Sequence, residues 1–129
     1  RLYLAQVAEN WSGGGVVRAT LRIRNRRMPL EWPVGGVGHV FAAGGIVLHS
    51  RRRDVYFERA TGREGGYEVL ARGRGESGIT LVPLSGRVRA IECGGEDIEF
   101  SAHPECARAV QFRLRLAAVT RFRVSLEKS

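Results

Sequence analysis

The chain has 129 residues and a formal net charge of +8, from 21 lysines and arginines against 13 aspartates and glutamates. This length fits one domain, so we predict a single domain over residues 1–129. A hydrophobic content of 43% excludes a disordered chain. No apolar run approaches the ~18 residues of a membrane-spanning helix. Only Lys128 is a lysine, so guanidinium groups carry nearly all of the positive charge.

The N-terminal part contains one clear strand. Residues 1–12 fit either a strand or a helix, because a short apolar run does not fix its period. Glycines 13–15 break the chain. Val17–Arg24 alternates apolar and polar residues and predicts a strand with basic outer positions. These outer positions are Arg18, Arg22 and Arg24. We expect the strand to end before Pro29, because proline cannot donate a ladder hydrogen bond.

Glycines divide the middle of the chain into short apolar or alternating runs. They predict strands at residues 38–43, 46–49, 54–59, 67–72, 79–84, 87–93 and 97–101. Gly73, Gly75 and Gly78 are expected to interrupt the strands around them. Ser85-Gly86 and Gly94-Gly95 are expected to form hairpin turns.

The strongest pattern in the chain runs from Val110 to Leu126. Its even positions are apolar apart from one threonine, while the odd positions include Arg113, Arg115, Arg121 and Arg123. A period of two predicts a strand with its even positions on the core. As one straight strand it would span on the order of 55 Å, too long for a compact domain. Either residues 117–120 form a bulge or corner that switches sheets, or part of the strand reaches a neighbouring subunit.

About eight to ten short strands with regular turn signals therefore predict an all-β, antiparallel fold, either a sandwich or a barrel. Of the two, we predict an immunoglobulin-like sandwich.

Catalytic chemistry has little support in this sequence. The paired carboxylates Asp97 with Glu99 and Glu92 with Glu96 could act as acid and base. They fit better as exposed partners of the arginines. A metal set could be drawn from Cys93, His103 and Cys106 with His39 or His49, but the tight cysteine spacing of structural zinc sites is missing. We therefore expect no enzyme, no cofactor and no metal.

Two signals favour an extracellular or cell-surface location over a cytoplasmic one. Cys93 and Cys106 could form a disulfide, with two unrelated thiols as the alternative. Asn10-Trp11-Ser12 is a glycosylation sequon with Asn10 as the acceptor. Since the chain begins at Arg1 rather than Met, we expect a processed piece with any targeting segment upstream.

The arginine-bearing strands are the strongest functional feature of the sequence. If the two strands pair, their arginines merge into one basic sheet that attracts nucleic acid, anionic glycans or acidic proteins. Binding of single-stranded nucleic acid also needs exposed aromatic rings. The alternation places Phe112 and Phe122 on the core face, so Tyr56 is the candidate for an exposed ring. The competing interpretation is a solvated face. Its arginines would pair with Glu58, Glu68, Asp97 and Glu99.

Residues Val17–Asn25, followed by Met28-Pro29-Leu30, resemble the opening strand and turn of immunoglobulin-like domains in secreted prokaryotic proteins. Such domains occur in adhesion modules and in filament and accessory proteins of archaeal surfaces. The resemblance implies a non-catalytic binding or assembly module of a surface filament or cell-surface layer. Its partner would be another protein or a second copy, bound through sheet edges. The alternative is a basic β-barrel that binds nucleic acid.

Overall fold

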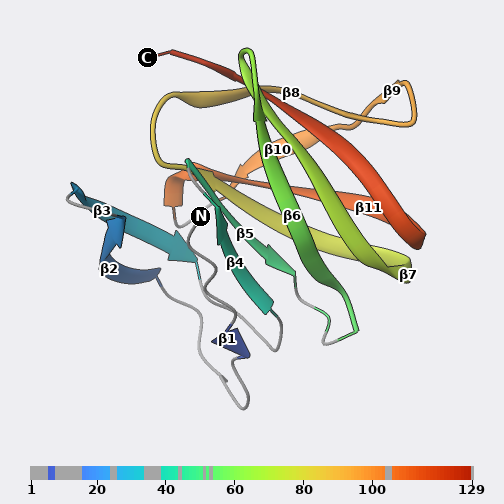
Figure 1. Cartoon of the computed structure of the whole chain (residues 1–129), viewed down its shortest axis with the longest axis horizontal. Coiled ribbons are helices and arrows are strands. Elements are labelled where there is room, and N and C mark those ends of the chain that lie inside the picture. The colour runs from blue at the N-terminus through green and yellow to red at the C-terminus, as the bar shows by residue number, and fades with distance from the viewer. Residues whose placement is uncertain are drawn as a thin grey trace.

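The computed structural model describes the backbone of residues 6–7, 16–23, 26–33, 39–43, 45–50, 52, 54–103 and 106–128. It describes the side chains of residues 45–50, 52, 54–103 and 108–128. Every regular element in these ranges is a strand (Figure 1). The strands are β1 (Gln6–Val7), β2 (Val16–Ile23), β3 (Arg26–Pro33), β4 (His39–Ala43), β5 (Ile46–Ser50), β6 (Tyr56–Arg63), β7 (Gly66–Pro83), β8 (Arg87–Cys93), β9 (Glu96–Asp97), β10 (Phe100–His103) and β11 (Cys106–Glu127).

All strand pairs are antiparallel, and β7 and β11 form the centre. The main sheet has the order β1-β4-β5-β7-β11-β8-β9, while β6 also pairs with β7 and β10 with β11. The β7–β11 ladder runs without a break from Val110 opposite Leu81 to Ser125 opposite Gly66. β2 and β3 form a separate two-stranded sheet. The predicted all-β, antiparallel fold is thus confirmed.

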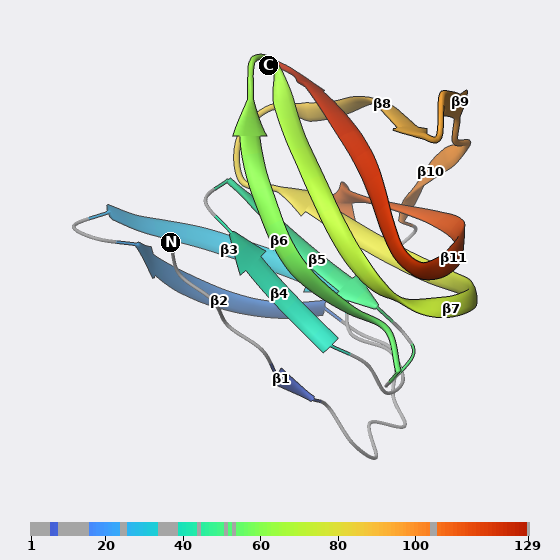
Figure 2. The same ribbon diagram turned by 45° about the vertical axis from the view of Figure 1, so that its right-hand side comes forward.

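The central ladder bends in its middle, where Ala118 lies opposite Gly73 (Figure 2). Ala118 has φ of 63°, and Gly73 and Gly75 have φ of 147° and 86°. These conformations turn an extended chain and favour glycine. The backbone N–H of Ala117 donates to the hydroxyl of Thr120 at 3.1 Å, which satisfies a backbone donor at the turn. The corner predicted at residues 117–120 is therefore present.

The bend divides the main sheet into two arms. The first arm holds β1, β4, β5, β10 and the halves of β7 and β11 that pair with β5 and β10. The second arm holds β6, β8, β9 and the halves that pair with β6 and β8. Strands that pass from one layer to the next through a bend are typical of orthogonally packed sheets.

The core lies between the two arms. Odd positions of β7 and even positions of β11 point inward on both sides of the bend, as Ile79, Leu114 and Phe122 illustrate. Phe112 of the first arm meets Phe122 of the second, with ring centroids 5.7 Å apart. Tyr67 also reaches from the second arm toward Gly45, where an added Cβ would lie 2.3 Å from the tyrosine hydroxyl. Both contacts hold the arms together.

The outer face of the first arm is also buried near β5. All five residues of β5 are buried, and the outward-facing Val47 and Val82 are as buried as the inward-facing positions. β3 packs near β11, so the β2–β3 hairpin lies beside this arm. Burial on both faces explains why Ile46–His49 reads as a continuous apolar run rather than an alternating one.

Several predicted strand boundaries were wrong. Gly73, Gly75 and Gly78 do not end a strand, because β7 pairs with β11 through all three. β2 ends at Ile23, before Pro29 as predicted, but Pro29 itself lies inside the next strand, β3, opposite Thr20. Ser85-Gly86 is a bend but not a hairpin turn, because β8 pairs with β11 instead of β7. Within residues 1–12 the structure describes one short strand, β1.

Candidate functional site

The outer surface of the bent β7–β11 ladder carries a group of arginines that we call the basic face. Its members are Arg72, Arg74, Arg113, Arg115, Arg121 and Arg123. They point outward because the odd positions of β11 and the even positions of β7 lie opposite the core. On these outward positions of β7, only Glu68 and Glu76 are acidic. The basic face is therefore positively charged across the bend.

Two members of the basic face have carboxylate partners. Arg113 Nη1 lies 3.3 Å from Glu76 Oε1, and Arg72 Nε donates to Glu58 Oε2. The hydrogen bond from Arg72 lowers the pKa of Glu58 and raises the pKa of Arg72. All of these side chains are well exposed to water, where ion pairs stabilise a fold only weakly.

The other four arginines have no such partner. Among the described residues, the side chains of Arg74, Arg115, Arg121 and Arg123 make no hydrogen bond or ion pair. A fixed sheet that holds guanidinium groups without internal partners leaves their donors for an external oxyanion. Arg123 differs from the other three because carboxylates compensate its charge: its cross-strand neighbours on β7 and β8 are Glu68 and Glu92. The uncompensated charge thus centres on the bend and ends before Arg123.

The bend itself is held by Arg52, which precedes β6. Its Nη1 donates to the carbonyl oxygens of Arg74 at 2.8 Å and Glu76 at 3.0 Å. These carbonyls lie between the stretch of β7 that pairs with β5 and the stretch that pairs with β6. Asp54 accepts from the same guanidinium, which lowers the pKa of Asp54. Arg52 therefore fixes the backbone from which Arg74 projects.

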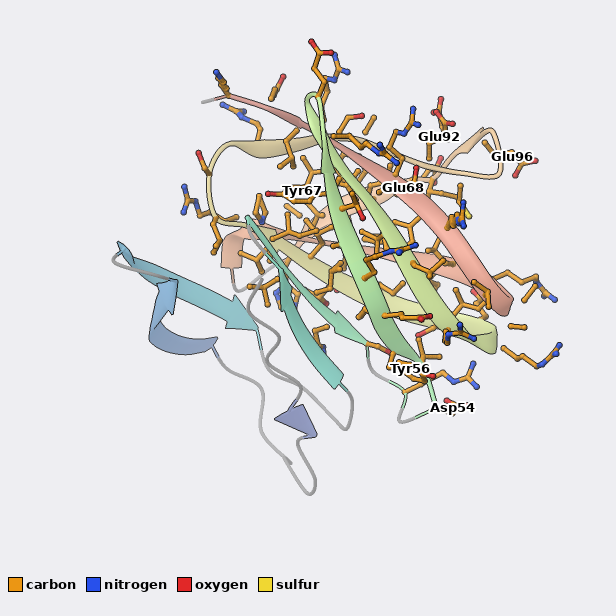
Figure 3. The ribbon with its side chains drawn as sticks, viewed as in Figure 1. Asp54, Tyr56, Tyr67, Glu68, Glu92 and Glu96 are labelled. Atoms are coloured by element: carbon orange, nitrogen blue, oxygen red, sulfur yellow. The ribbon has the colours of Figure 1, made fainter. Side chains whose placement is uncertain are left out.

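An exposed aromatic ring borders the basic face. Tyr56 of β6 lies directly across from Arg72, which in turn lies across from Val119 of β11. Among the described side chains, Tyr56 and Val119 are the two large apolar residues that are most exposed, at 47% and 44%. Figure 3 shows Tyr56 beside Asp54 at one end of the second arm, far from Glu92 and Glu96 at the other. The exposed apolar surface therefore lies within the basic region and away from those acidic groups.

A polar hollow lies on the first-arm side of the same surface. It has a volume of about 320 Å³ and forms where Gly78 leaves no side chain opposite Arg113. Thr80, Ser101 and Gln111 also line it. The basic face is thus interrupted by a hollow with hydrogen-bonding groups before it reaches the buried part of the first arm.

The structure separates the two predicted sets of arginines. β2 pairs with β3 and not with β11, so Arg18 and Arg22 do not join Arg113 and Arg115 in one ladder. The side chains of Arg18 and Arg22, and all of Arg24 and Asn10, lie outside the described residues. Sequence reasoning missed Arg72 and Arg74, and also Arg52, whose hydrogen bonds hold the bend. Only the pairing of β7 with β11 places these residues on this surface.

Two of the predicted acidic partners form ion pairs, but with arginines other than those predicted. Glu58 pairs with Arg72, and Glu68 lies 4.0 Å from Arg63. Asp97 and Glu99 make no ion pair with any described residue. Glu76 is a partner that sequence reasoning missed, since it pairs with Arg113 across the ladder.

The predicted disulfide between Cys93 and Cys106 was wrong. Cys93 carries a free thiol. It faces Phe122 on the second arm, whereas Cys106 begins β11 on the first arm and lies opposite His103. The Cys93 thiol donates to the carbonyl of Arg121 at 3.5 Å instead. Burial, together with Glu96, raises the pKa of this thiol.

Metal ligands do not gather in the part of the chain that the structure describes, where no three His, Cys, Asp or Glu side chains could hold an ion together. No helix in that part has the length and apolarity to cross a membrane. Comparison with known proteins gives no significant match to a family model, a curated protein or a solved structure.

Proposed function

We propose that the chain is a non-catalytic binding module that holds an anionic macromolecule on its basic face. The observation that supports this is the set of four guanidinium groups without partners among the described residues. They project from the β7–β11 ladder, whose two strands are hydrogen-bonded to each other. Hydrogen bonds from Arg52 hold the bend of this ladder in place. Such a preorganised surface binds an anionic partner without first breaking internal ion pairs.

The test compares two double variants that lose the same charge. Arg115→Gln/Arg121→Gln removes two members of the basic face, while Arg87→Gln/Arg89→Gln removes two exposed arginines of β8. Fluorescein-labelled heparin is the probe, and its anisotropy is followed from low to high salt. We expect the first double variant to lose most of the binding and the second to keep it. Equal losses would show that binding follows net charge. No binding of the wild type at low salt, either to heparin or to another polyanion, would overturn the proposal.

Assembly through sheet edges is a second candidate function. β6 is hydrogen-bonded to one neighbour only, and so is β10, within the described part of the chain. Open edges can add a strand from another copy or another protein. β11 pairs with β7 on one side, and on the other side with β10 up to Phe112 and with β8 from Phe122, so only residues 113–121 of β11 lack a second strand in the described part of the chain. Sedimentation at increasing protein concentration tests this candidate, and a monomer throughout would exclude self-assembly.

An extracellular module with an immunoglobulin-like sandwich, in a surface filament or layer, stays part of this second candidate. Its support is the sequon at Asn10, the resemblance of residues 17–30 and two antiparallel layers around one core. β7 and β11 run through both layers, whereas immunoglobulin domains keep each strand in one sheet. The free thiol of Cys93 removes the disulfide as a support for secretion.

A further inference from the structure

We propose that the partner of the basic face is a single-stranded nucleic acid, with Tyr56 as the platform on which one base stacks. This inference rests on the proposed function, because it names the polymer that the arginines hold. A single strand alternates flat bases with phosphate groups. The surface around Tyr56 alternates apolar and cationic side chains in a matching way.

The two apolar side chains, Tyr56 and Val119, lie in one row across three strands with Arg72 between them. Tyr56, Arg72 and Val119 lie side by side on β6, β7 and β11, so their Cα atoms follow each other at the spacing of neighbouring strands, roughly 5 Å. The hydrogen bond and charge of Glu58 raise the pKa of Arg72, and Tyr56 lies close enough to add a smaller contribution. A half-exposed tyrosine beside an arginine is a common platform for a base, because both offer a flat surface for stacking.

The cationic part flanks this row on both sides. Arg74 follows Arg72 by two residues on β7, and Arg121 follows Val119 by two residues on β11. Two residues of a strand span roughly 7 Å, so both guanidinium groups lie one step from the row. Neither side chain has a hydrogen-bonding or ionic partner in the described residues. A base on Tyr56 would thus place its neighbouring phosphates near unpaired donors.

The shape of this surface favours a single strand over a duplex. It is the outside of a bend in a sheet, and the part of the chain that the structure describes has no helix to enter a groove. A duplex stacks its bases on one another and hides their flat faces, which a single strand exposes. An anionic glycan would use the arginines but has no aromatic base to place on Tyr56. The exposed ring of Tyr56 therefore favours a nucleic acid over other polyanions as the partner.

The experiment measures binding of fluorescein-labelled oligo(dT) and oligo(U) of about 15 nucleotides, with a duplex of equal length and labelled heparin in parallel. The variants are Tyr56→Ala, Tyr56→Phe, Arg121→Gln and, as a control outside the basic face, Arg89→Gln. All three positions are exposed, and circular dichroism checks that each of the four variants folds. We expect wild type to prefer single strands over the duplex.

Tyr56→Ala should weaken single-strand binding at least about fivefold, while Tyr56→Phe keeps it and heparin binding stays unchanged. Arg121→Gln should lower the slope of log K against log salt by about 0.7, and Arg89→Gln should not. Binding to heparin without binding to either oligonucleotide would overturn this inference and leave the proposed function standing. Equal affinity for the duplex, or equal affinities of Tyr56→Ala and Tyr56→Phe, would also overturn it. No binding to any polyanion would overturn both.

Discussion

The rings of Phe112 and Phe122 meet edge to face at a centroid distance of 5.7 Å and an interplanar angle of 68°, although both belong to β11. Ten residues of straight strand would separate them by roughly 33 Å. The contact therefore exists only because the strand turns back at Ala118. It joins the two arms in the centre of the core, where both side chains are almost fully buried.

Truncating either ring should destabilise the whole fold. We expect Phe122→Ala to lower the free energy of unfolding by about 3–5 kcal/mol, because it removes a large side chain that is 2% exposed. A double-mutant cycle with Phe112→Ala should give a coupling of about 0.5–1.5 kcal/mol. Urea unfolding followed by circular dichroism measures both quantities. Strictly additive single effects would contradict a direct contact between the rings.

Gly73 should not tolerate a side chain. A Cβ at this position would lie 2.7 Å from Val55 Cγ2 and 3.0 Å from the carbonyl oxygen of Asp54, and its φ of 147° disfavours other residues. We expect Gly73→Ala to cost about 1–3 kcal/mol of unfolding free energy. Gly62→Ala is the matched control, because a Cβ there meets only Tyr67 at 3.9 Å. A thermal melt that ranks the two variants equally would argue against the packed bend.

Two carboxylates should titrate below their ordinary pKa values for separate reasons. Arg72 lowers the pKa of Glu58 from 4.5, and Arg52 lowers the pKa of Asp54 from 3.8. Since each pKa is lower in the folded state, the ion pairs stabilise the fold at neutral pH, and this stabilisation is lost as the pH falls below those values. In Arg72→Gln, an NMR titration should show the pKa of Glu58 rising while that of Asp54 stays low. A shift of both together would mean that the variant disturbs the bend.

Cys93 should react slowly with thiol reagents at neutral pH. Burial and the nearby charge of Glu96 raise its pKa and keep the less nucleophilic thiol form. We expect Glu96→Gln to speed the reaction of this cysteine with an aromatic disulfide reagent, and denaturation to speed it far more. Peptide mapping after alkylation identifies the residue. A denatured, unreduced protein in which Cys93 resists alkylation would contradict the free thiol.

Local patterns in the sequence predict much of β11. The alternation from Val110 to Leu126 identifies its inward side chains, and its length indicates either a corner at residues 117–120 or a reach into a neighbouring subunit, of which the structure shows the corner. The same reasoning finds β2, β4, β5 and β8 nearly to the residue. These features depend on periodicity and on turn residues, which lie close together in the chain.

Local patterns in the sequence did not predict which distant strands pair with each other. Gly73, Gly75 and Gly78 look like strand breaks in sequence, yet β7 pairs with β11 through all three, and Gly73 and Gly75 adopt the positive φ angles that let the strand turn. The placement of Arg72 and Arg74 beside Arg115 and Arg121 follows from the same pairing, and so does the separation of Cys93 from Cys106. Tyr56 was a candidate for exposure, but only its register with Arg72 places it in the basic region.

The central place of β11 also sets the order in which the protein can fold. β11 follows every other described strand in the chain, and its partners on β7 lie 29 residues earlier at Val110 and Leu81, and 59 earlier at Ser125 and Gly66. A nascent chain on the ribosome therefore presents β5, β6 and β7 with their apolar faces uncovered until residue 127 has emerged. Closure of such distant pairs is slow, so we expect these strands to complete their fold only after β11 has emerged and to need protection from aggregation in that interval.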